Sequence, residues 1–195
     1  MSECAVILAG GQARRMGGGD KCRLPLGGVS LIERVIDRTR PQVQSLVLNA
    51  NGEIQRFADL QLEVLQDSIA DFPGPLAGVL AGMDWAAEQG YEWLISVAAD
   101  TPFFPEDLVA RLSQSDSPVT LAATPDPIRG RLPQPPLGPW RGERRDDIGA
   151  SLWAGGRRSL AWTQAQGETL ILFDEDDFFN INTPEDLVSA ERFIT

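Results

Sequence analysis

A segment rich in glycine and basic residues, 9–21, follows a short apolar run near the amino terminus. Its five glycines let a backbone approach a ligand closely and point N–H groups at it, as loops that hold phosphate require. Arg14, Arg15 and Lys21 supply cations for phosphate oxygens. The segment contains neither the Gly-Lys-Ser/Thr of a P-loop nor Gly-x-Gly-x-x-Gly. It predicts a site for a phosphorylated ligand, with a flexible, charged turn as the alternative.

Polar residues follow three further apolar runs that are predicted to be strands. Asn49 ends the second strand, Asp67 follows the third and Asp100 follows the fourth. Ligands of open α/β sheets bind beyond the carboxyl ends of the strands, so we expect these side chains near the glycine-rich segment. Asp100 is the candidate ligand for Mg²⁺, which takes one or two carboxylates together with phosphate oxygens. The alternative for each residue is a structural role in a turn or at a helix start.

Residues 74–78 form a second stretch with glycines, Gly-Pro-Leu-Ala-Gly, at the start of a predicted helix. Because Gly74 and Gly78 have no side chain, a planar base could lie against the backbone there. Close packing of the helix start is the alternative, and for this stretch taken alone it is the better interpretation.

The elements that must position these residues alternate along the chain. Apolar runs predict strands over residues 5–8, 46–48, 62–65, 93–98, 119–122, 170–173 and 178–181. Helical spacing and helix-start signals predict helices over residues 31–36, 76–85, 105–112, 159–166 and from 184 onward. This order predicts an α/β fold with a mostly parallel sheet and helices on both faces. Residues 124–145 depart from it with six prolines, which predict a loop or a broken edge strand.

The composition bounds the class of protein. The length of 195 residues suits a single domain over 1–195. A net charge of −11 argues against general nucleic-acid binding, yet residues 1–60 carry eight Lys/Arg and six Asp/Glu, which fits a local anion site. No apolar run approaches the roughly 20 residues that cross a bilayer, and no secretory signal is visible. Two cysteines make neither a disulfide framework nor a metal motif, so we expect a cytoplasmic protein.

Taken together, these motifs resemble nucleotidyltransferases of the molybdenum cofactor guanylyltransferase (MobA) type. The resemblance implies a Rossmann-like fold, with a nucleotide-binding part over about 1–115 and an acceptor-side part over about 116–195. It also implies transfer of GMP from GTP to the terminal phosphate of molybdopterin or Mo-molybdopterin, with Mg²⁺ as cofactor. We expect a monomer that can also interact with molybdoenzyme maturation proteins. The blocks that carry the resemblance occur in order: residues 8–21, 49–51, 66–68, 74–78, 100–103, 155–158 and 180–187.

The resemblance also implies a role for each matching residue. The catalytic groups would be Arg15 and Lys21, which neutralise the triphosphate, and Asp100, which holds Mg²⁺. Lys21 and Asp100 would also bind the nucleotide. The guanine and ribose pocket would be lined by Leu8, Ala9, Gly10, Gly11, Asn49, Asp67, Gly74 and Gly78. The pterin acceptor would be bound by Arg157, Arg158, Asn180 and Asn182.

Two features depart from the family pattern. Relatives usually carry a His-Pro before a strand, whereas residues 134–140 here contain three prolines and no histidine. The acidic run 174–177 precedes Asn180, where an anionic acceptor is expected. Phe178 and Phe179 are expected in the core rather than as a pterin-stacking pair.

Two rival functions remain open at this stage. One is a cytidylyltransferase or sugar-phosphate nucleotidyltransferase of the same superfamily, although Gly11 and the 74–78 block favour guanine. The other is a catalytically silent module that binds and delivers the cofactor. Release of pyrophosphate distinguishes an enzyme from such a module.

Overall fold

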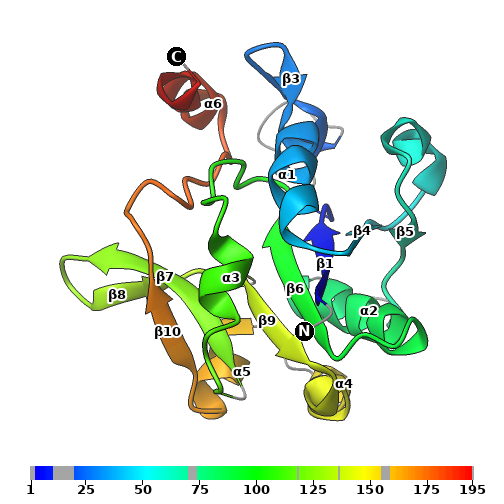
Figure 1. Cartoon of the computed structure of the whole chain (residues 1–195). Helices are drawn as coiled ribbons and strands as arrows, with labels where there is room; N and C mark the ends of the chain where they lie inside the picture. Colours follow the sequence, from blue (N-terminus) through cyan, green and yellow to red (C-terminus); the bar gives the residue numbers. More distant parts are fainter. Residues whose placement is uncertain are drawn as a thin grey trace.

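The main sheet has five strands in the order β5–β4–β1–β6–β9 (Figure 1). The structure is a computed structural model that describes residues 3–10, 20–69, 74–117, 119–135, 137–154 and 159–194. Strands β5, β4, β1 and β6 run parallel, and β9 is antiparallel to β6. The strands are β1 (Glu3–Leu8), β4 (Ser45–Asn49), β5 (Val64–Leu65), β6 (Trp93–Ala98) and β9 (Gly138–Arg141). The carboxyl ends of the four parallel strands therefore meet along one edge, which is the upper edge of β1 and β6 in Figure 1.

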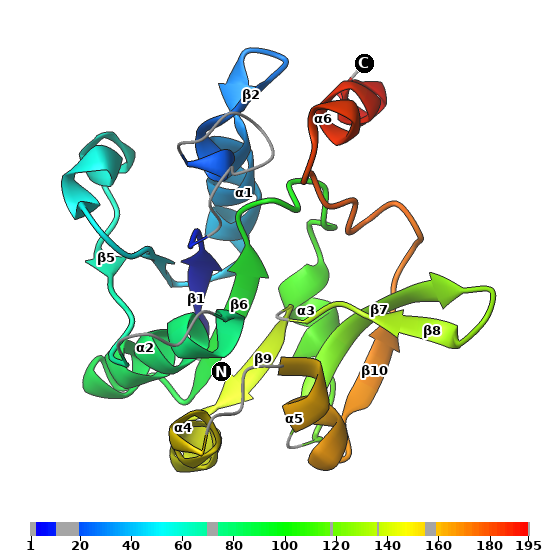
Figure 2. The same ribbon diagram turned by 180° about the vertical axis from the view of Figure 1, so that it is seen from behind.

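Helices cover both faces of this sheet (Figures 1 and 2). The helices are α1 (Leu31–Thr39), α2 (Pro75–Glu88), α3 (Leu108–Leu112), α4 (Arg145–Trp153), α5 (Ser159–Ala165) and α6 (Pro184–Ala190). Ala5 and Ile7 of β1 enter the core that contains α1 and α3, whereas Cys4 and Val6 enter the core that contains α2 and α4. Alternate side chains of β1 are thus buried on opposite faces, which explains its unbroken apolar run.

A second, smaller sheet lies beside the main one on the side of β9 (Figure 1). It has the order β10–β7–β8, with β10 parallel and β8 antiparallel to β7. A short hairpin, β2–β3, leads into α1. The remaining strands are β2 (Pro25–Leu26), β3 (Val29–Ser30), β7 (Thr120–Asp126), β8 (Gly130–Pro133) and β10 (Thr169–Leu172).

Short 3₁₀ segments connect several of these elements. They are η2 (Lys21–Arg23), η3 (Arg40–Gln42), η4 (Ile54–Leu60), η5 (Gly142–Arg144) and η6 (Glu191–Phe193). Segment η4 crosses from β4 to β5 and was not predicted. None of the helices in the described parts of the chain is long and apolar enough to cross a membrane.

Most of the predicted elements are confirmed, and two need correction. Residues 178–181, predicted to be a strand, form a turn followed by irregular chain. Phe178 and Ile181 are buried there as separate side chains, without strand pairing. The helix predicted over 105–112 begins only at Leu108, because residues 105–107 form an irregular turn. The proline-rich segment does contain a broken edge strand: β8 and β9 interrupt it, and Pro139 lies opposite Ile95 at the sheet edge.

Candidate nucleotide site

Lys21 is the centre of a charged cluster at the carboxyl edge of the main sheet. It is the last residue of the glycine-rich segment 9–21 and the first of η2, and it is only 8% exposed. Its ammonium forms an ion pair with Asp100, two residues beyond β6, and donates to Asn182 Oδ1 at 2.6 Å. The Ile181 N–H also donates to the Asp100 carbonyl at 3.0 Å. We call Lys21, Asp100 and Asn182 the phosphate end, because a nearly buried ammonium at this edge is placed to bind phosphate oxygens.

The start of α6 fixes the backbone of Asn182. The carboxylate of Asp186 accepts the N–H groups of Asn182 and Thr183, both at 2.9 Å. Thr183 in return caps the helix by accepting the Asp186 N–H at 3.2 Å. The hydrogen bond from the Asn182 backbone, more than any other interaction, holds the pKa of Asp186 below its usual range. Asn180, the other predicted acceptor residue, is exposed two residues earlier in the same segment.

A second polar group lies at the ends of β4 and β5. Asn49 donates to Asp67 Oδ1 at 2.9 Å, and Asn51 donates to Asp67 Oδ2 at 2.7 Å. The Asp67 N–H donates back to Asn51 Oδ1 at 2.9 Å. Both carboxylate oxygens of Asp67 are therefore held by amides, and its backbone is held as well. We call Asn49, Asn51 and Asp67 the base end, after the role that the sequence predicts for Asn49 and Asp67.

Gly78 brings the first turns of α2 against the base end. A Cβ at this position would lie 2.8 Å from Leu8 Cδ2 and would overlap the side-chain amide of Asn49. A glycine is therefore needed for close packing here, which agrees with the alternative interpretation of residues 74–78 as a closely packed helix start. Gly74 is the N-cap of α2, and Ala77 N–H donates to its carbonyl at 3.3 Å.

The end of β1 also borders this group. Ala9 is buried, and its N–H donates to the Asn49 carbonyl at 2.9 Å. Leu8 is half-buried, and Gly10 is exposed with nothing within 4 Å of an added Cβ. The predicted residues Leu8 and Ala9 thus lie next to Asn49 of the base end, and Gly10 follows them in the chain. Five predicted residues with individual roles fall outside the described residues: Gly11, Arg14, Arg15, Arg157 and Arg158.

The donor set suits a magnesium ion that arrives with a nucleotide. Within the described ranges, no three His, Cys, Asp or Glu side chains come together as a metal site, so no closed protein cage is found there. Asp100 contributes one carboxylate, 21% exposed, beside a cation that can pair with phosphate. Mg²⁺ commonly uses one or two carboxylates and completes its shell with phosphate oxygens and water. The described residues therefore fit Mg²⁺ bound jointly by Asp100 and a ligand.

Two residues at the site were missed by sequence analysis. Asn51 lies within a motif block but received no individual role. Arg56, in η4, contacts Asn51 of the base end and Asp20, which directly precedes Lys21 of the phosphate end. The only sequence signal for it was the excess of basic residues in the first 60 positions, because the partners of an arginine depend on tertiary structure.

The family of the chain follows from comparison of its sequence with known families. Residues 5–168 match the family described as the MobA-like NTP transferase domain. The chain belongs to this family. The match includes Lys21, Asn49, Asp67 and Asp100, and it ends before Asn182. The predicted family resemblance is confirmed.

Members of the MobA-like family resemble the chain over nearly its whole length. The molybdenum cofactor guanylyltransferase of Nitrobacter hamburgensis is 44% identical over 195 residues, covering 96% of this chain and 92% of that protein. A protein of the same name from Mesorhizobium japonicum is 40% identical over 199 residues, covering 97% and 94%. A third, from Cereibacter sphaeroides, is 43% identical over 190 residues, covering 97% and 95%. The similarity therefore extends into the carboxyl-terminal part that the family match does not reach.

Solved structures support the fold. Molybdopterin-guanine dinucleotide biosynthesis protein A from Archaeoglobus fulgidus aligns with a TM-score of 0.76 at 23% identity, covering 98% of each chain. The 4-diphosphocytidyl-2C-methyl-D-erythritol synthase from Anaerococcus prevotii aligns with a TM-score of 0.78 at 13% identity, covering 99% and 96%. At such identities the likeness concerns the fold alone. It confirms the predicted Rossmann-like α/β fold of this MobA-like protein.

Proposed function

We propose that this protein is a molybdenum cofactor guanylyltransferase. It transfers GMP from GTP to the terminal phosphate of molybdopterin and releases pyrophosphate. The observation that carries this proposal is the joining of Lys21, Asp100 and Asn182 at the carboxyl edge of the sheet. Support comes from full-length relatives at 40–44% identity that bear this name.

The reaction exchanges one phosphoanhydride bond for another. An oxygen of the acceptor phosphate attacks the α-phosphorus of GTP and forms a new P–O bond. The bond from the α-phosphorus to the oxygen that bridges to the β-phosphate breaks, and the electron pair leaves with pyrophosphate. The protein therefore has to hold two anions in line and neutralise their charge, and it needs no covalent nucleophile. The absence of histidine from the sequence is no obstacle.

The ion pair at the phosphate end is suited to exchange its partners when nucleotide binds. The Lys21 ammonium turns from Asp100 to the oxygens of the triphosphate, and Asn182 continues to orient it. Asp100 is then available to hold Mg²⁺, which when bound supplies positive charge to the phosphate oxygens. Arg15 adds a second cation on the side of the glycine-rich segment.

The base end is suited to recognise the nucleoside. A carboxylate accepts hydrogen bonds from the N1–H and exocyclic amine of guanine or from ribose hydroxyls. Asp67 supplies such a carboxylate, and Asn49 and Asn51 hold it in one orientation. Residues 8–11 and 74–78 line the pocket around it. A cytosine ring offers a different pattern of donors, so this group favours GTP over CTP.

The acceptor lies on the carboxyl-terminal side of the phosphate end. Asn182 already contacts Lys21, and Asn180 is exposed nearby in the same segment. We assign pterin binding to these two residues together with Arg157 and Arg158. On this assignment the part from about 116 to 195, which includes the second sheet, forms the acceptor side, and residues 1–115 form the nucleotide side.

Two measurements test the proposal. A thermal-shift panel of GTP, CTP, ATP and UTP, with and without Mg²⁺, should show stabilisation by GTP of several degrees, because a ligand at about 100 times its Kd stabilises by about 2.7 kcal/mol. With molybdopterin added, pyrophosphate should appear together with the guanine dinucleotide.

The outcomes separate the rival functions. A preference for CTP in both assays would make the protein a cytidylyltransferase. Binding of GTP and molybdopterin without any pyrophosphate would make it a cofactor-delivery module. Either result would overturn the guanylyltransferase proposal.

A further inference from the structure

Arg56 connects the two ends of the site through a single guanidinium. Its Nε donates to Asp20 Oδ2 at 2.7 Å, and Asp20 directly precedes Lys21 of the phosphate end. Its Nη2 donates to the carbonyl of Asn51 at 2.8 Å, and the Asn51 side chain holds Asp67 of the base end. Both partners lie beyond the last residues of β1 and β4. Arg56 therefore links the segment that follows β1 to the segment that follows β4.

The side chain of Arg56 is itself held in place. Its guanidinium lies 4.5 Å from the centre of the ring of Phe57, which is fully buried. Arg23 lies over the same ring at 5.0 Å and binds both carboxylate oxygens of Asp59, at 2.7 and 2.5 Å. Arg23 also donates to the carbonyl of Arg56 at 2.6 Å. Segment η4 is thus fixed around one aromatic ring, so Arg56 loses little freedom when it binds Asp20 and Asn51.

We propose that Arg56 is a positioning residue that keeps the phosphate end and the base end in register for one nucleotide. This inference rests on the proposed function, because only a ligand that spans both ends requires their separation to be fixed. A nucleoside or a triphosphate alone needs one end. When the two ends are held together, binding at the second end follows binding at the first at a high effective concentration.

A purely structural role for Arg56 predicts a different result. Partly exposed ion pairs contribute about 0–1 kcal/mol to stability, and loss of one would lower the melting temperature while leaving ligand binding unchanged. A positioning role instead predicts a loss of affinity in the Arg56 variant that is large for GTP, which spans both ends, and small for a ligand that reaches only one end. The two roles can be separated by comparing GTP with its two halves.

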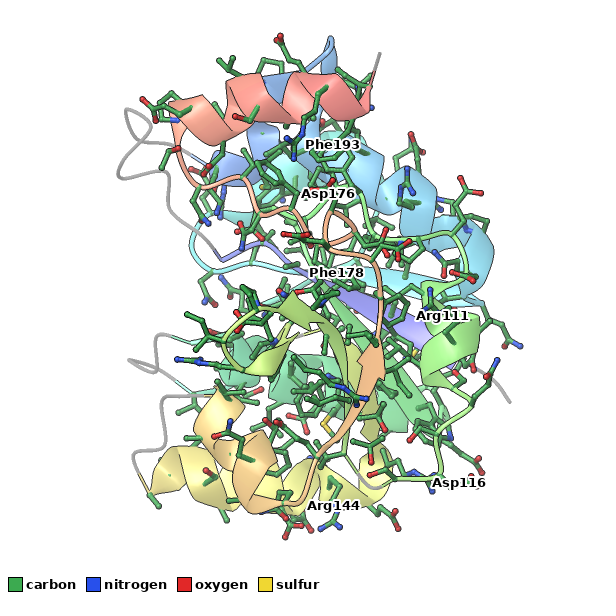
Figure 3. The ribbon with its side chains drawn as sticks, turned by 90° about the vertical axis from the view of Figure 1, so that its left-hand side faces the viewer. Arg111, Asp116, Arg144, Asp176, Phe178 and Phe193 are labelled. Carbon is green, nitrogen blue, oxygen red and sulfur yellow. The ribbon has the colours of Figure 1, made fainter. Side chains whose placement is uncertain are left out.

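The experiment measures Kd for GTP, guanosine and inorganic tripolyphosphate by calorimetry or ligand-observed NMR, in the wild type and in Arg56→Ala. We expect the Kd for GTP to rise about tenfold, while the Kd of each half changes less than about twofold. Arg111→Ala is the matched control, since Arg111 lies 3.8 Å from the ring centre of Phe173 and donates to the Leu172 carbonyl at 2.7 Å. Arg111 lies on α3, at the right of the view in Figure 3. This control should lose similar stability and keep all three Kd values.

Conservative replacement provides a second variant in case Arg56→Ala does not fold. Arg56→Lys keeps the charge but cannot reach Asp20 and Asn51 with separate nitrogens, so the Kd for GTP should still rise, by about threefold. An unchanged Kd for GTP in the folded variants would overturn the inference. So would a rise in the Kd for guanosine or for tripolyphosphate as large as the rise for GTP. A wild-type protein that binds GTP no more tightly than guanosine would overturn the proposed function itself.

Discussion

The phosphate end and the base end of the site are built differently. The phosphate end is an ion pair around a nearly buried ammonium, assembled from residues 21, 100 and 182. The base end is a set of amide–carboxylate hydrogen bonds from two neighbouring strands. Charge develops during transfer only at the phosphates, whereas the base is the same before and after the reaction. Changes at the phosphate end should therefore act mainly on kcat, and changes at the base end mainly on KM for GTP.

The largest expected effect is that of Asp100→Asn. Removal of one preorganised charge interaction commonly lowers kcat by about 10²–10³-fold, or about 3–4 kcal/mol. The amide oxygen can still accept a hydrogen bond from Lys21, so the free energy of unfolding should fall by only about 1–2 kcal/mol. Steady-state kinetics and chemical denaturation measure the two quantities.

The control for this variant is Asp84→Asn. Asp84 is also partly exposed and pairs with Arg145 on α4. Its loss should leave kcat unchanged. A near-normal kcat in Asp100→Asn would remove this residue from the reaction and make the phosphate end a purely structural ion pair.

The next effect is that of Gly78→Ala at the base end. The added methyl group overlaps Asn49 and Leu8, and such overpacking costs about 1–3 kcal/mol of stability. Because Asn49 holds Asp67, the KM for GTP should rise as well. Gly82→Ala is a matched control on the same helix, since its Cβ would lie 2.8 Å from Leu94 Cδ2 and 3.0 Å from Val6 Cγ1. Equal changes of KM in the two variants would contradict the link between Gly78 and nucleotide binding.

Asp67→Asn should raise the KM for GTP by about tenfold, equivalent to about 1.4 kcal/mol, with kcat changed less than twofold. The substitution replaces one of the two carboxylate oxygens that accept from Asn49 and Asn51 with an amide group that cannot accept. Glu63→Gln, in the same stretch, alters a contact with Trp85 instead and should leave KM unchanged. A fall in kcat without a rise in KM would show that the two ends are not separate in function.

The smallest effect is that of Asp186→Asn, which weakens the cap that fixes Asn182. We expect a loss of about 1 kcal/mol of stability at neutral pH and a modest fall in kcat. The folded-state pKa of Asp186 is lowered, so its contribution is complete above the unfolded pKa of about 3.9 and is lost as pH falls through the folded pKa. Denaturation at pH 7 and near pH 3.5 should show the difference between wild type and variant shrinking in acid. A difference that grows in acid would contradict the assignment.

The sequence was sufficient to predict which residues would gather at the sheet edge. Asn49, Asp67 and Asp100 each follow a parallel strand, and parallel strands bring their carboxyl ends together. The contact of Asn182 with Lys21 was beyond such reasoning, because it joins residues from opposite ends of the chain. The family motif pointed to Asn182, but not to its partner.

The errors have physical causes. Residues 178–181 have the apolar content of a strand, yet Phe178 and Ile181 enter different hydrophobic clusters, and Phe178 lies in the middle of the view in Figure 3. An apolar run alone does not show whether its side chains are buried separately or belong to a hydrogen-bonded strand. By contrast, the broken edge strand predicted from the prolines is present, and Pro139 is accommodated in β9 because that strand forms the edge of the sheet.

The packing of the last helix has a consequence for the newly made protein. Ile181, which precedes Asn182, and Ala190 of α6 pack in one cluster with Leu26 and Leu31. A ribosome releases Lys21 and Asp100 long before it adds residues 181–190, and domains fold as their chain emerges. The nascent chain can form its sheet before Asn182 has been made, but it completes the phosphate end only after Asn182 and the start of α6 have emerged. Shortened chains that lack α6 would therefore keep much of the sheet and lose Asp186, which fixes the backbone of Asn182.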